Sequence, residues 1–410
     1  MRYVAEDSPT TRSVQLRPWL SVVIVIISIF GGSSCGHREP TGKSKPIFDH
    51  WENIVGWPVP TKPLSEKLRI LIWRDYLDPR ILSFFQTRYN IRLEIVYFEN
   101  NPELKKIFKN EPTGFDILMP SDFVVEGYLK NIVDPLLAPI RRENVPNLAH
   151  VKKSFFRLQY DPELVYSVPI FYSVLGIGFN NKTVQHLPRD FTLRTSNSEE
   201  NLMLFGYRAI LNEPRVSLSA ALIDDGVDPN SPTPETLALT ANRLANDVGT
   251  LGIRFLADSL PNDMVDEKIK IALCWSGAAA AASRKNSNIR FILPKGQKKL
   301  YQIDSFVIPA TSTRKYTAEF FINFLLIPEI SGALTNYSVY ANSNADSTPF
   351  ILRDILQGPA YMEPPSDSRL FLADLGELES EFERAWLQIK QKNPTVKIKV
   401  PYRAEVRIEK

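Results

Sequence analysis

Short apolar runs alternate with amphipathic segments along the first third of the chain. Residues 67–73 form an apolar run, and Asp78 followed by a proline provides the start of a helix with apolar side chains at helical spacing. Residues 91–98 alternate as a strand does, residues 102–110 read as a charged helix, and residues 115–119 as a buried strand. This order predicts an α/β fold with a mostly parallel sheet covered by helices on both faces.

The rest of the chain continues the alternation. Residues 166–179 are too long, β-branched and aromatic for one ordinary strand, so we interpret them as a hinge segment that crosses between two lobes. The further helices are predicted at 233–247, 276–285, 329–336 and 378–392, and the further strands at 270–275, 289–293 and 302–308. A length of 410 residues agrees with two or three domains.

The N-terminus has the order of an export signal. An uncharged run over 18–34, strongly apolar over 19–30, is followed by small residues and Cys35. A membrane span needs about 20 apolar residues, which favours a cleaved or lipidated leader over the alternative, an uncleaved signal anchor. The small residues resemble a bacterial lipoprotein box, although Gly32 stands where that box usually has leucine. We expect 1–34 to be a lipoprotein-type signal peptide and Cys35 to be the lipidated residue.

Two further segments flank the predicted body. Residues 35–66 are rich in Pro, Lys and Ser, and we interpret them as a tether between the membrane and the folded part. Residues 395–410 alternate apolar and basic side chains and form a basic C-terminal tail, either an edge strand or a loose extension. The protein is therefore expected outside the cytoplasm, in the periplasm or an equivalent compartment.

The composition excludes several classes of protein. The 49 Lys and Arg exceed the 46 Asp and Glu by only 3, too few and too scattered for a nucleic-acid surface. Two cysteines and four histidines exclude a disulfide framework and structural zinc, and Cys274 is expected to be buried in apolar surroundings. The body of the chain has no nucleophile elbow, H-E-x-x-H motif or phosphate-binding glycine loop. We expect that the protein is not an enzyme and that it binds no metal and no cofactor.

The residues that follow the predicted strands are unusually aromatic and acidic. In open α/β sheets, ligands bind outside the carboxyl ends of the strands, so these residues are candidates for a site. They are Trp73, Arg74, Asp75, Tyr76, Ser121, Asp122, Phe123, Trp275, Asp304 and Tyr340. Ring faces attract a cation and pack on methylenes, and carboxylates accept charge-assisted hydrogen bonds from ammonium. The pattern therefore predicts a site for an organic cation.

Several short segments resemble, in the same order, the spermidine/putrescine-binding proteins of bacterial ABC importers. The most specific are Leu71-Ile-Trp-Arg-Asp-Tyr76, Phe115-Asp-Ile-Leu-Met-Pro-Ser121, Tyr166-Ser-Val-Pro169, Gly176-Ile-Gly178-Phe-Asn180, Cys274-Trp-Ser-Gly277 and Ile303-Asp-Ser-Phe-Val-Ile-Pro309. The resemblance implies a two-lobed, type II periplasmic-binding-protein fold, in which each lobe is a mixed sheet flanked by helices. It places lobe 1 at 67–174 and 304–344, and lobe 2 at 175–303 and 345–394.

The resemblance also implies a ligand box. Its positions fall on Trp73, Tyr76, Ser121, Trp275, Asp304 and Tyr340, with Phe123 in place of a family tyrosine and Glu213 near a second family acid. Three residues depart from the family pattern: Arg74 replaces a small hydroxyl residue, Val216 an acid and Gln302 a tryptophan. Because an uncompensated buried charge costs several kcal/mol, we expect a shorter or differently charged ligand than spermidine. In an alternative orientation, Arg74 turns outward and pairs with Asp75.

The resemblance therefore implies a lipid-anchored, monomeric receptor that captures a polyamine and delivers it to an ABC permease driven by its ATPase. One alternative keeps the fold but binds a zwitterionic or anionic molecule through Arg74. A second alternative is a surface lipoprotein without a transport role.

Overall fold

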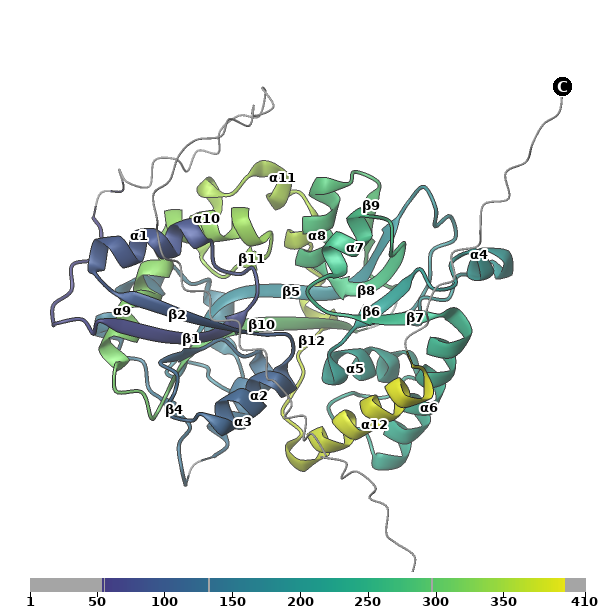
Figure 1. Ribbon diagram of the computed structural model, residues 1–410, viewed down its shortest axis with the longest axis horizontal. Helices are drawn as coiled ribbons and strands as arrows, with labels where there is room; N and C mark the ends of the chain where they lie inside the picture. Colours follow the sequence, from purple (N-terminus) through teal and green to yellow (C-terminus); the bar gives the residue numbers. More distant parts are fainter. Residues whose placement is uncertain (1–53, 55, 132, 296–297, 395–410) are drawn as a thin grey trace, which may run out of the picture.

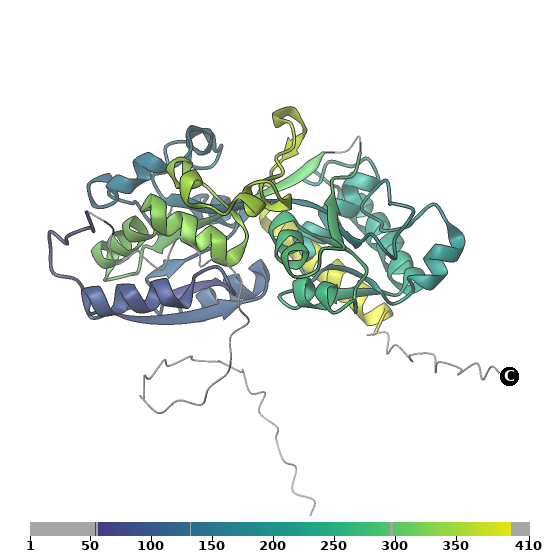
Figure 2. The ribbon, with the colours of Figure 1, turned by 90° about the horizontal axis from the view of Figure 1, so that it is seen from above.

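Two lobes lie side by side and are joined by two long strands (Figures 1 and 2). The structure, a computed structural model, describes residues 54, 56–131, 133–295 and 298–394. The connecting strands are β5 (Ser167–Asn180) and β10 (Lys299–Pro309), which pair antiparallel and are buried along their whole length. The interpretation of residues 166–179 as one segment that crosses between the lobes is confirmed, because β5 pairs with strands of both. The predicted signal peptide, Cys35, most of the tether and the tail lie outside the described residues.

Lobe 1 carries the strands at one end of a continuous 12-stranded sheet, in the order β2-β1-β3-β10-β5. Its elements are β1 (Lys67–Trp73), α1 (Pro79–Tyr89), β2 (Arg92–Phe98), α2 (Asn101–Asn110), β3 (Ile117–Leu118), α3 (Asp122–Leu129), β4 (Leu137–Ala138), η2 (Arg142–Asn144), η3 (Pro146–His150), η4 (Lys153–Arg157), α9 (Lys315–Leu325), α10 (Pro328–Ser338), β11 (Ala341–Asn342) and η5 (Ala345–Phe350). β1 is parallel to β2 and β3, whereas β10 is antiparallel to β3.

Lobe 2 carries the other end of the sheet, in the order β5-β8-β6-β7, with β9 also paired to β5. Its elements, with those of the segment that returns to it, are α4 (Ser198–Met203), β6 (Arg208–Leu211), α5 (Pro214–Asp224), α6 (Pro234–Leu251), β7 (Ile253–Leu256), α7 (Leu260–Val265), β8 (Ile271–Trp275), α8 (Ser276–Lys285), β9 (Ile289–Ile292), α11 (Arg353–Leu356), η6 (Pro359–Tyr361), η7 (Ser366–Ser368), β12 (Arg369–Leu370), η8 (Gly376–Leu378) and α12 (Glu379–Lys392). The sheet is therefore mixed, and the simpler expectation of a mostly parallel sheet is wrong.

Local sequence signals explain where several elements begin. The Asp78 side chain accepts a hydrogen bond from the Arg80 backbone N–H, and Pro79 stands in the first turn of α1 as predicted. α1 ends where Asn90 adopts a left-handed conformation, with φ of 52°. Helices cover both faces of the sheet in each lobe, with α1, α10, α7 and α8 above it and α2, α3, α5, α6 and α12 below it in the view of Figure 1.

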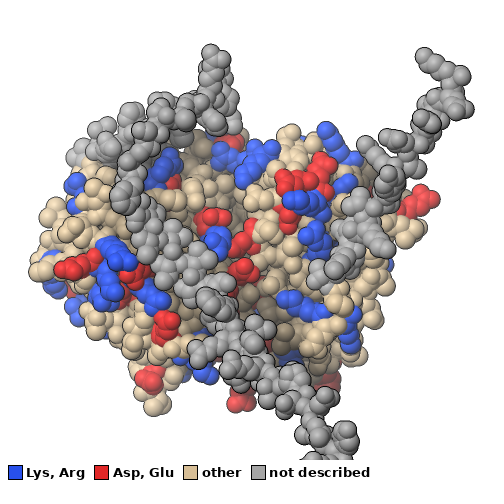
Figure 3. Space-filling model, viewed as in Figure 1, with Lys and Arg blue, Asp and Glu red and all other residues tan. Residues whose placement is uncertain are grey.

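The division of the chain between lobes stays a prediction in detail. η5 begins at Ala345, the first residue of the range predicted for lobe 2, but it packs on α10 of lobe 1. η6 packs on α8 of lobe 2. Acidic and basic side chains are interspersed over the face seen in Figure 3, without a broad area of one sign. Within the described ranges, no single helix is long and apolar enough to cross a membrane, and only the pair α9 and α10, bent by 77°, meets those criteria together.

Candidate functional site

A cleft of about 580 Å³ lies between the two lobes. Lobe 1 lines it with residues at and after the end of β1 and with Tyr340 after α10, and lobe 2 lines it with residues at the ends of β6, β7 and β8. Six predicted site residues besides Tyr340 line it, namely Trp73, Arg74, Asp75, Tyr76, Glu213 and Trp275. A volume of this size is typical of small-molecule sites.

Aromatic rings in tilted and edge-on contact form one wall of the cleft. The rings of Tyr76 and Tyr340 have centroids 5.0 Å apart, and Tyr76 also meets Phe171 edge-on at 4.9 Å. Tyr340 packs directly on the first turn of α8, because a Cβ atom at Gly277 would lie 2.5 Å from its ring. The glycine thus lets a ring carried by the segment after α10 approach a helix of lobe 2.

Asp304 lies immediately behind this wall rather than on the cleft surface. It is 3% exposed, and a register shift between Asp304 and Ser305 interrupts the β5–β10 ladder at this point. Its Oδ2 accepts a hydrogen bond of 2.9 Å from the Tyr76 hydroxyl, and its Oδ1 accepts bonds from Ser121 and Gln302. Burial raises the pKa of Asp304 to about 6, although these hydrogen bonds favour the charged form. Tyr76 and Gln302, which line the cleft, therefore separate the Asp304 carboxylate from it and hydrogen-bond to that carboxylate.

Besides Asp304, two further predicted ligand-box residues do not line the cleft. Ser121 is fully buried, and its hydroxyl connects Asp304 with the side chain of Asn101. Phe123 is also buried and lines a separate, small void, where the ammonium of Lys105 stands 5.8 Å from its ring. The two residues occupy the N-terminus of α3, which turns their side chains away from the cleft.

Glu213 is the buried carboxyl group that borders the cleft. It is 7% exposed and precedes Pro214 at the start of α5. Its Oε2 accepts a hydrogen bond of 2.9 Å from the backbone N–H of Asn101 in the opposite lobe, and its Oε1 has no hydrogen-bond partner among the described residues. Burial raises the pKa of Glu213 to about 7, opposed by the Asn101 hydrogen bond and by Lys105. This oxygen is therefore a buried acceptor without a donor at the border of the cleft.

Arg74 makes an ion pair across the mouth of the cleft. Its Nε lies 3.0 Å from Oδ2 of Asp258 in lobe 2, and its guanidinium stands 4.9 Å from the centroid of the Tyr97 ring. The alternative in which Arg74 pairs with Asp75 is wrong for this arrangement, because the only ion pair described for Arg74 is with Asp258.

Sequence reasoning missed two acids that line the cleft, Glu99 and Asp258. Glu99 directly follows β2, and Asp258 stands two residues past the end of β7. The rule that identified the other residues, inspection of strand ends, also applies to Glu99. Asp258 could not be found in this way, because the four residues of β7 had not been recognised as a strand.

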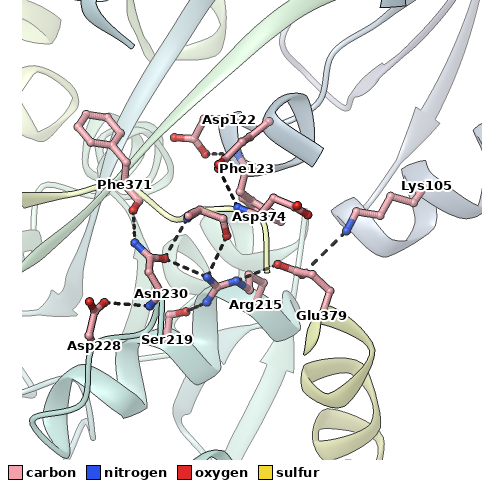
Figure 4. Close-up of polar contacts among 12 residues, drawn as sticks. Lys105, Asp122, Phe123, Arg215, Ser219, Asp228, Asn230, Phe371, Asp374 and Glu379 are labelled. Atoms are coloured by element: carbon pink, nitrogen blue, oxygen red, sulfur yellow. Dashed lines mark hydrogen bonds and ion pairs between the residues drawn. The ribbon is translucent and has the colours of Figure 1, made fainter. Parts of the chain in front are cut away.

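A buried ionic network lies beneath the cleft (Figure 4). Arg215, 2% exposed, donates to Glu379 of α12 and to Ser219, Asn230 and the Ala373 carbonyl oxygen. Lys105 of lobe 1 approaches the same Glu379 at 3.9 Å. Val216, at the position where spermidine binders are expected to carry an acid, is fully buried beside this network and contributes no charge to the cleft.

The cleft is not lined by Cys274, His150 or His186. Burial raises the pKa of the Cys274 thiol to about 12, which keeps it protonated near neutral pH. His150 and His186 each contact a carboxylate away from the cleft, Asp346 and Glu200 respectively. Within the described residues, no group of three or more His, Cys, Asp or Glu side chains could hold a metal ion.

Comparison with known proteins gives consistent matches. A family model for bacterial extracellular solute-binding proteins matches residues 82–357. The putrescine-binding periplasmic protein PotF of Escherichia coli is 26% identical over 346 residues, covering 80% of this chain and 92% of the relative. The spermidine/putrescine-binding periplasmic protein 1 of Haemophilus influenzae is 22% identical, covering 80% and 90%.

Solved structures of similar proteins share the fold. A putative spermidine/putrescine ABC transporter protein from Listeria monocytogenes superposes with a TM-score of 0.72 at 24% identity, covering 80% of this chain and 99% of that one. The TpPotD lipoprotein of Treponema pallidum gives a TM-score of 0.68 at 22% identity, covering 79% and 99%. These matches confirm the predicted two-lobed, type II fold.

Proposed function

This chain belongs to the bacterial extracellular solute-binding proteins, and on that premise we propose that it captures a short polyamine, of the putrescine type, for an ABC importer. The lobes would enclose the ligand in the cleft and present it to a permease driven by a cytoplasmic ATPase. The relatives' names, which refer to putrescine and spermidine, support this ligand class. In this role the protein binds and releases its ligand without a covalent step.

One observation carries the proposal: an interlobe cleft whose aromatic wall is backed by buried acids. Tyr76 and Tyr340 present ring surface for methylene groups and for cation–π contacts. Glu213 offers a buried oxygen that lacks a protein donor, and Asp304 adds negative potential from behind the wall. An ammonium ion can supply the missing donor and charge together.

Trp73 and Trp275 complete the proposed box. Both line the cleft, from the ends of β1 and β8 respectively. The indole Nε1 of Trp73 is buried and makes no hydrogen bond of acceptable geometry to a described residue, although it lies near enough to Asp304 to help lower the pKa of that carboxyl. Ser121 and Phe123 contribute indirectly in this proposal, by supporting Asp304 and the floor of the cleft.

The anchoring proposal rests on the sequence before the described residues. Small residues directly before Cys35 support lipidation there, and a lipoprotein among the structural neighbours agrees with this anchoring. We propose that the mature chain is a monomer, held at the outer face of the membrane through Cys35 and residues 36–66. Mass spectrometry of the membrane fraction would test the lipid.

Isothermal titration calorimetry of residues 54–394 tests the ligand. Putrescine and cadaverine are expected to give saturable heats, and spermidine weaker ones, with Trp73→Ala losing most of the affinity. Saturable binding of an amino acid or organic acid with no response to amines would instead support a zwitterionic or anionic ligand. The absence of binding by all of these compounds would support a lipoprotein without a transport role.

A further inference from the structure

Three carboxylates gather at the mouth of the cleft. Asp75, Glu99 and Asp258, called here the acidic corner, follow β1, β2 and β7 and line one end of the cleft. Arg74 lies among them and pairs with Asp258 across the two lobes. The groups act on one another: burial raises the pKa of Asp258, Arg74 opposes the shift, and Glu99 and Asp75 add to it. The acidic corner therefore has the charge of a site for an ammonium ion, and the guanidinium of Arg74 occupies it.

The order of the strands brings two acids of the cleft to neighbouring strand ends in lobe 2. The sheet runs β10-β5-β8-β6-β7, with Asp304 on β10, Glu213 two residues past β6 and Asp258 two residues past β7. The ends of β6 and β7 are adjacent, because the Asn212 N–H donates to the Leu256 carbonyl oxygen. Glu213 and Asp258 thus lie at neighbouring strand ends, and Asp258 is also close enough to act on Tyr76 and Tyr340, the rings in front of Asp304.

Asp304, Glu213 and Asp258 differ in whether a basic side chain neutralises their charge. Neither Asp304 nor Glu213 makes an ion pair with a lysine or arginine within the described part of the chain, whereas Asp258 does. Two acids at or behind the cleft wall thus have no basic side chain paired with them, and the third already has a guanidinium. A ligand long enough to place a third ammonium at the acidic corner would meet a like charge there.

We propose that Arg74 is a specificity-determining residue, which takes the place of a third ligand ammonium and so restricts the cleft to diamines. This inference rests on the proposed function and deepens it. Arg74 also has a second hold on its position, because its guanidinium stacks over Tyr97 on β2. Both residues of this contact belong to lobe 1, so the contact does not depend on lobe 2.

The test compares putrescine and spermidine by calorimetry in four proteins: the wild type, Arg74→Ser, Asp258→Asn and the double variant. In Arg74→Ser, the affinity for spermidine relative to putrescine should rise by about tenfold, because Asp258 becomes free for an ammonium. The double variant should lose this gain, since no free carboxylate remains. Arg284→Ser is the matched control, because Arg284 lines the same cleft but pairs with Asp354.

Each outcome decides the matter. A ratio in Arg74→Ser equal to that of the wild type overturns the inference while leaving polyamine binding intact. A gain that persists in the double variant also overturns it, because removal of bulk rather than exposure of Asp258 would then be the cause. Failure of every protein to bind either amine refutes the proposed function and this inference with it.

Discussion

At the scale of single residues, burial disfavours the ionised form of Asp304. Burial raises its pKa from 3.8 to about 6 despite three hydrogen bonds. A carboxyl with a raised pKa in the folded state stabilises the protein below its unfolded pKa, and this contribution is lost as the pH rises through about 6. Ionised Asp304 therefore lowers the stability of the ligand-free protein at neutral pH, and a bound ammonium would offset that cost.

The first prediction follows for Asp304→Asn. At pH 7.5 the free energy of unfolding without ligand should rise by about 2 to 3 kcal/mol, the equivalent of the pKa shift, because no charge is buried. The Tyr76 hydroxyl can rotate to accept from the new amide, so the hydrogen bonds persist. Urea unfolding measures this gain, which should shrink at pH 4.5. Putrescine affinity should fall by about tenfold or more in the same variant. A variant that is less stable than the wild type and binds putrescine with the same affinity would contradict the role assigned to Asp304.

Glu213 gives the second prediction, which concerns pH. With a pKa of about 7, Glu213 is partly protonated near neutrality, and an ammonium prefers the ionised form. Putrescine affinity should therefore fall by roughly tenfold or more between pH 7.5 and 5.5, with the pKa of about 6 for Asp304 adding to the fall at the acidic end. Lys105 and Glu379 also act on Glu213 and must stay unchanged in the comparison.

Calorimetry across this pH range checks the prediction in Glu213→Gln. Its affinity should be lower at pH 7.5 and should vary less with pH. Glu99→Gln, which changes an exposed acid on the same cleft, should keep the wild-type slope. An equal slope in Glu213→Gln and wild type would assign the titration to another group.

At the scale of elements, α8 connects the aromatic wall to lobe 2. Gly277 in its first turn accepts the Tyr340 ring at a distance that excludes a Cβ atom. In Gly277→Ala the Tyr340 ring must shift away from α8, which disturbs its contact with Tyr76. We therefore expect a loss of stability of about 1 to 3 kcal/mol and weaker ligand binding. Thermal unfolding and putrescine titration measure the two effects. Ser283→Ala on the same helix should change neither appreciably, and an unaltered Gly277→Ala would show that the wall is not rigid.

The elements predicted correctly are those with local signals. α1 has its Asp78 cap and proline, and residues 271–285 switch cleanly from an apolar strand to an alanine-rich helix. α5 escaped detection because nine of its eleven residues are buried, so it has no polar face to mark a helical period. β6 and β7, with four residues each, were not recognised, although β9, of the same length, was. The antiparallel pairing of β10 depends on distant partners, which periodicity does not encode.

The site was predicted to a similar degree. Trp73 and Trp275 line the cleft because the end of a strand fixes their position. Phe123 lies in the first turn of α3. The direction of its side chain depends on how α3 packs against β10, and the sequence pattern does not predict that packing. The partner of Arg74 lies 184 residues away in the other lobe, so only the assembled fold identifies it.

At the scale of the whole molecule, polar contacts hold the lobes together. Arg74 with Asp258, Asn101 with Glu213 and Lys105 with Glu379 all join lobe 1 to lobe 2. The first of these pairs is about one-third to one-half exposed, and exposed ion pairs contribute roughly 0 to 1 kcal/mol. An exposed pair of this kind is too weak to keep the cleft closed by itself, whereas the paired strands β5 and β10 connect the two lobes and can act as the hinge.

We therefore predict that the ligand-free protein opens and that ligand closes it. The radius of gyration from small-angle X-ray scattering should fall when putrescine is added, because ligand contacts join the two lobes. Lys105→Met should raise the ligand-free value, since it removes one contact between the lobes but leaves the buried Arg215–Glu379 pair intact. Higher salt should act in the same direction by screening the exposed pairs. Identical scattering with and without saturating putrescine would show that the lobes are rigid, and the ligand would then enter through side-chain motion at the mouth, where Arg74 and Asp258 stand.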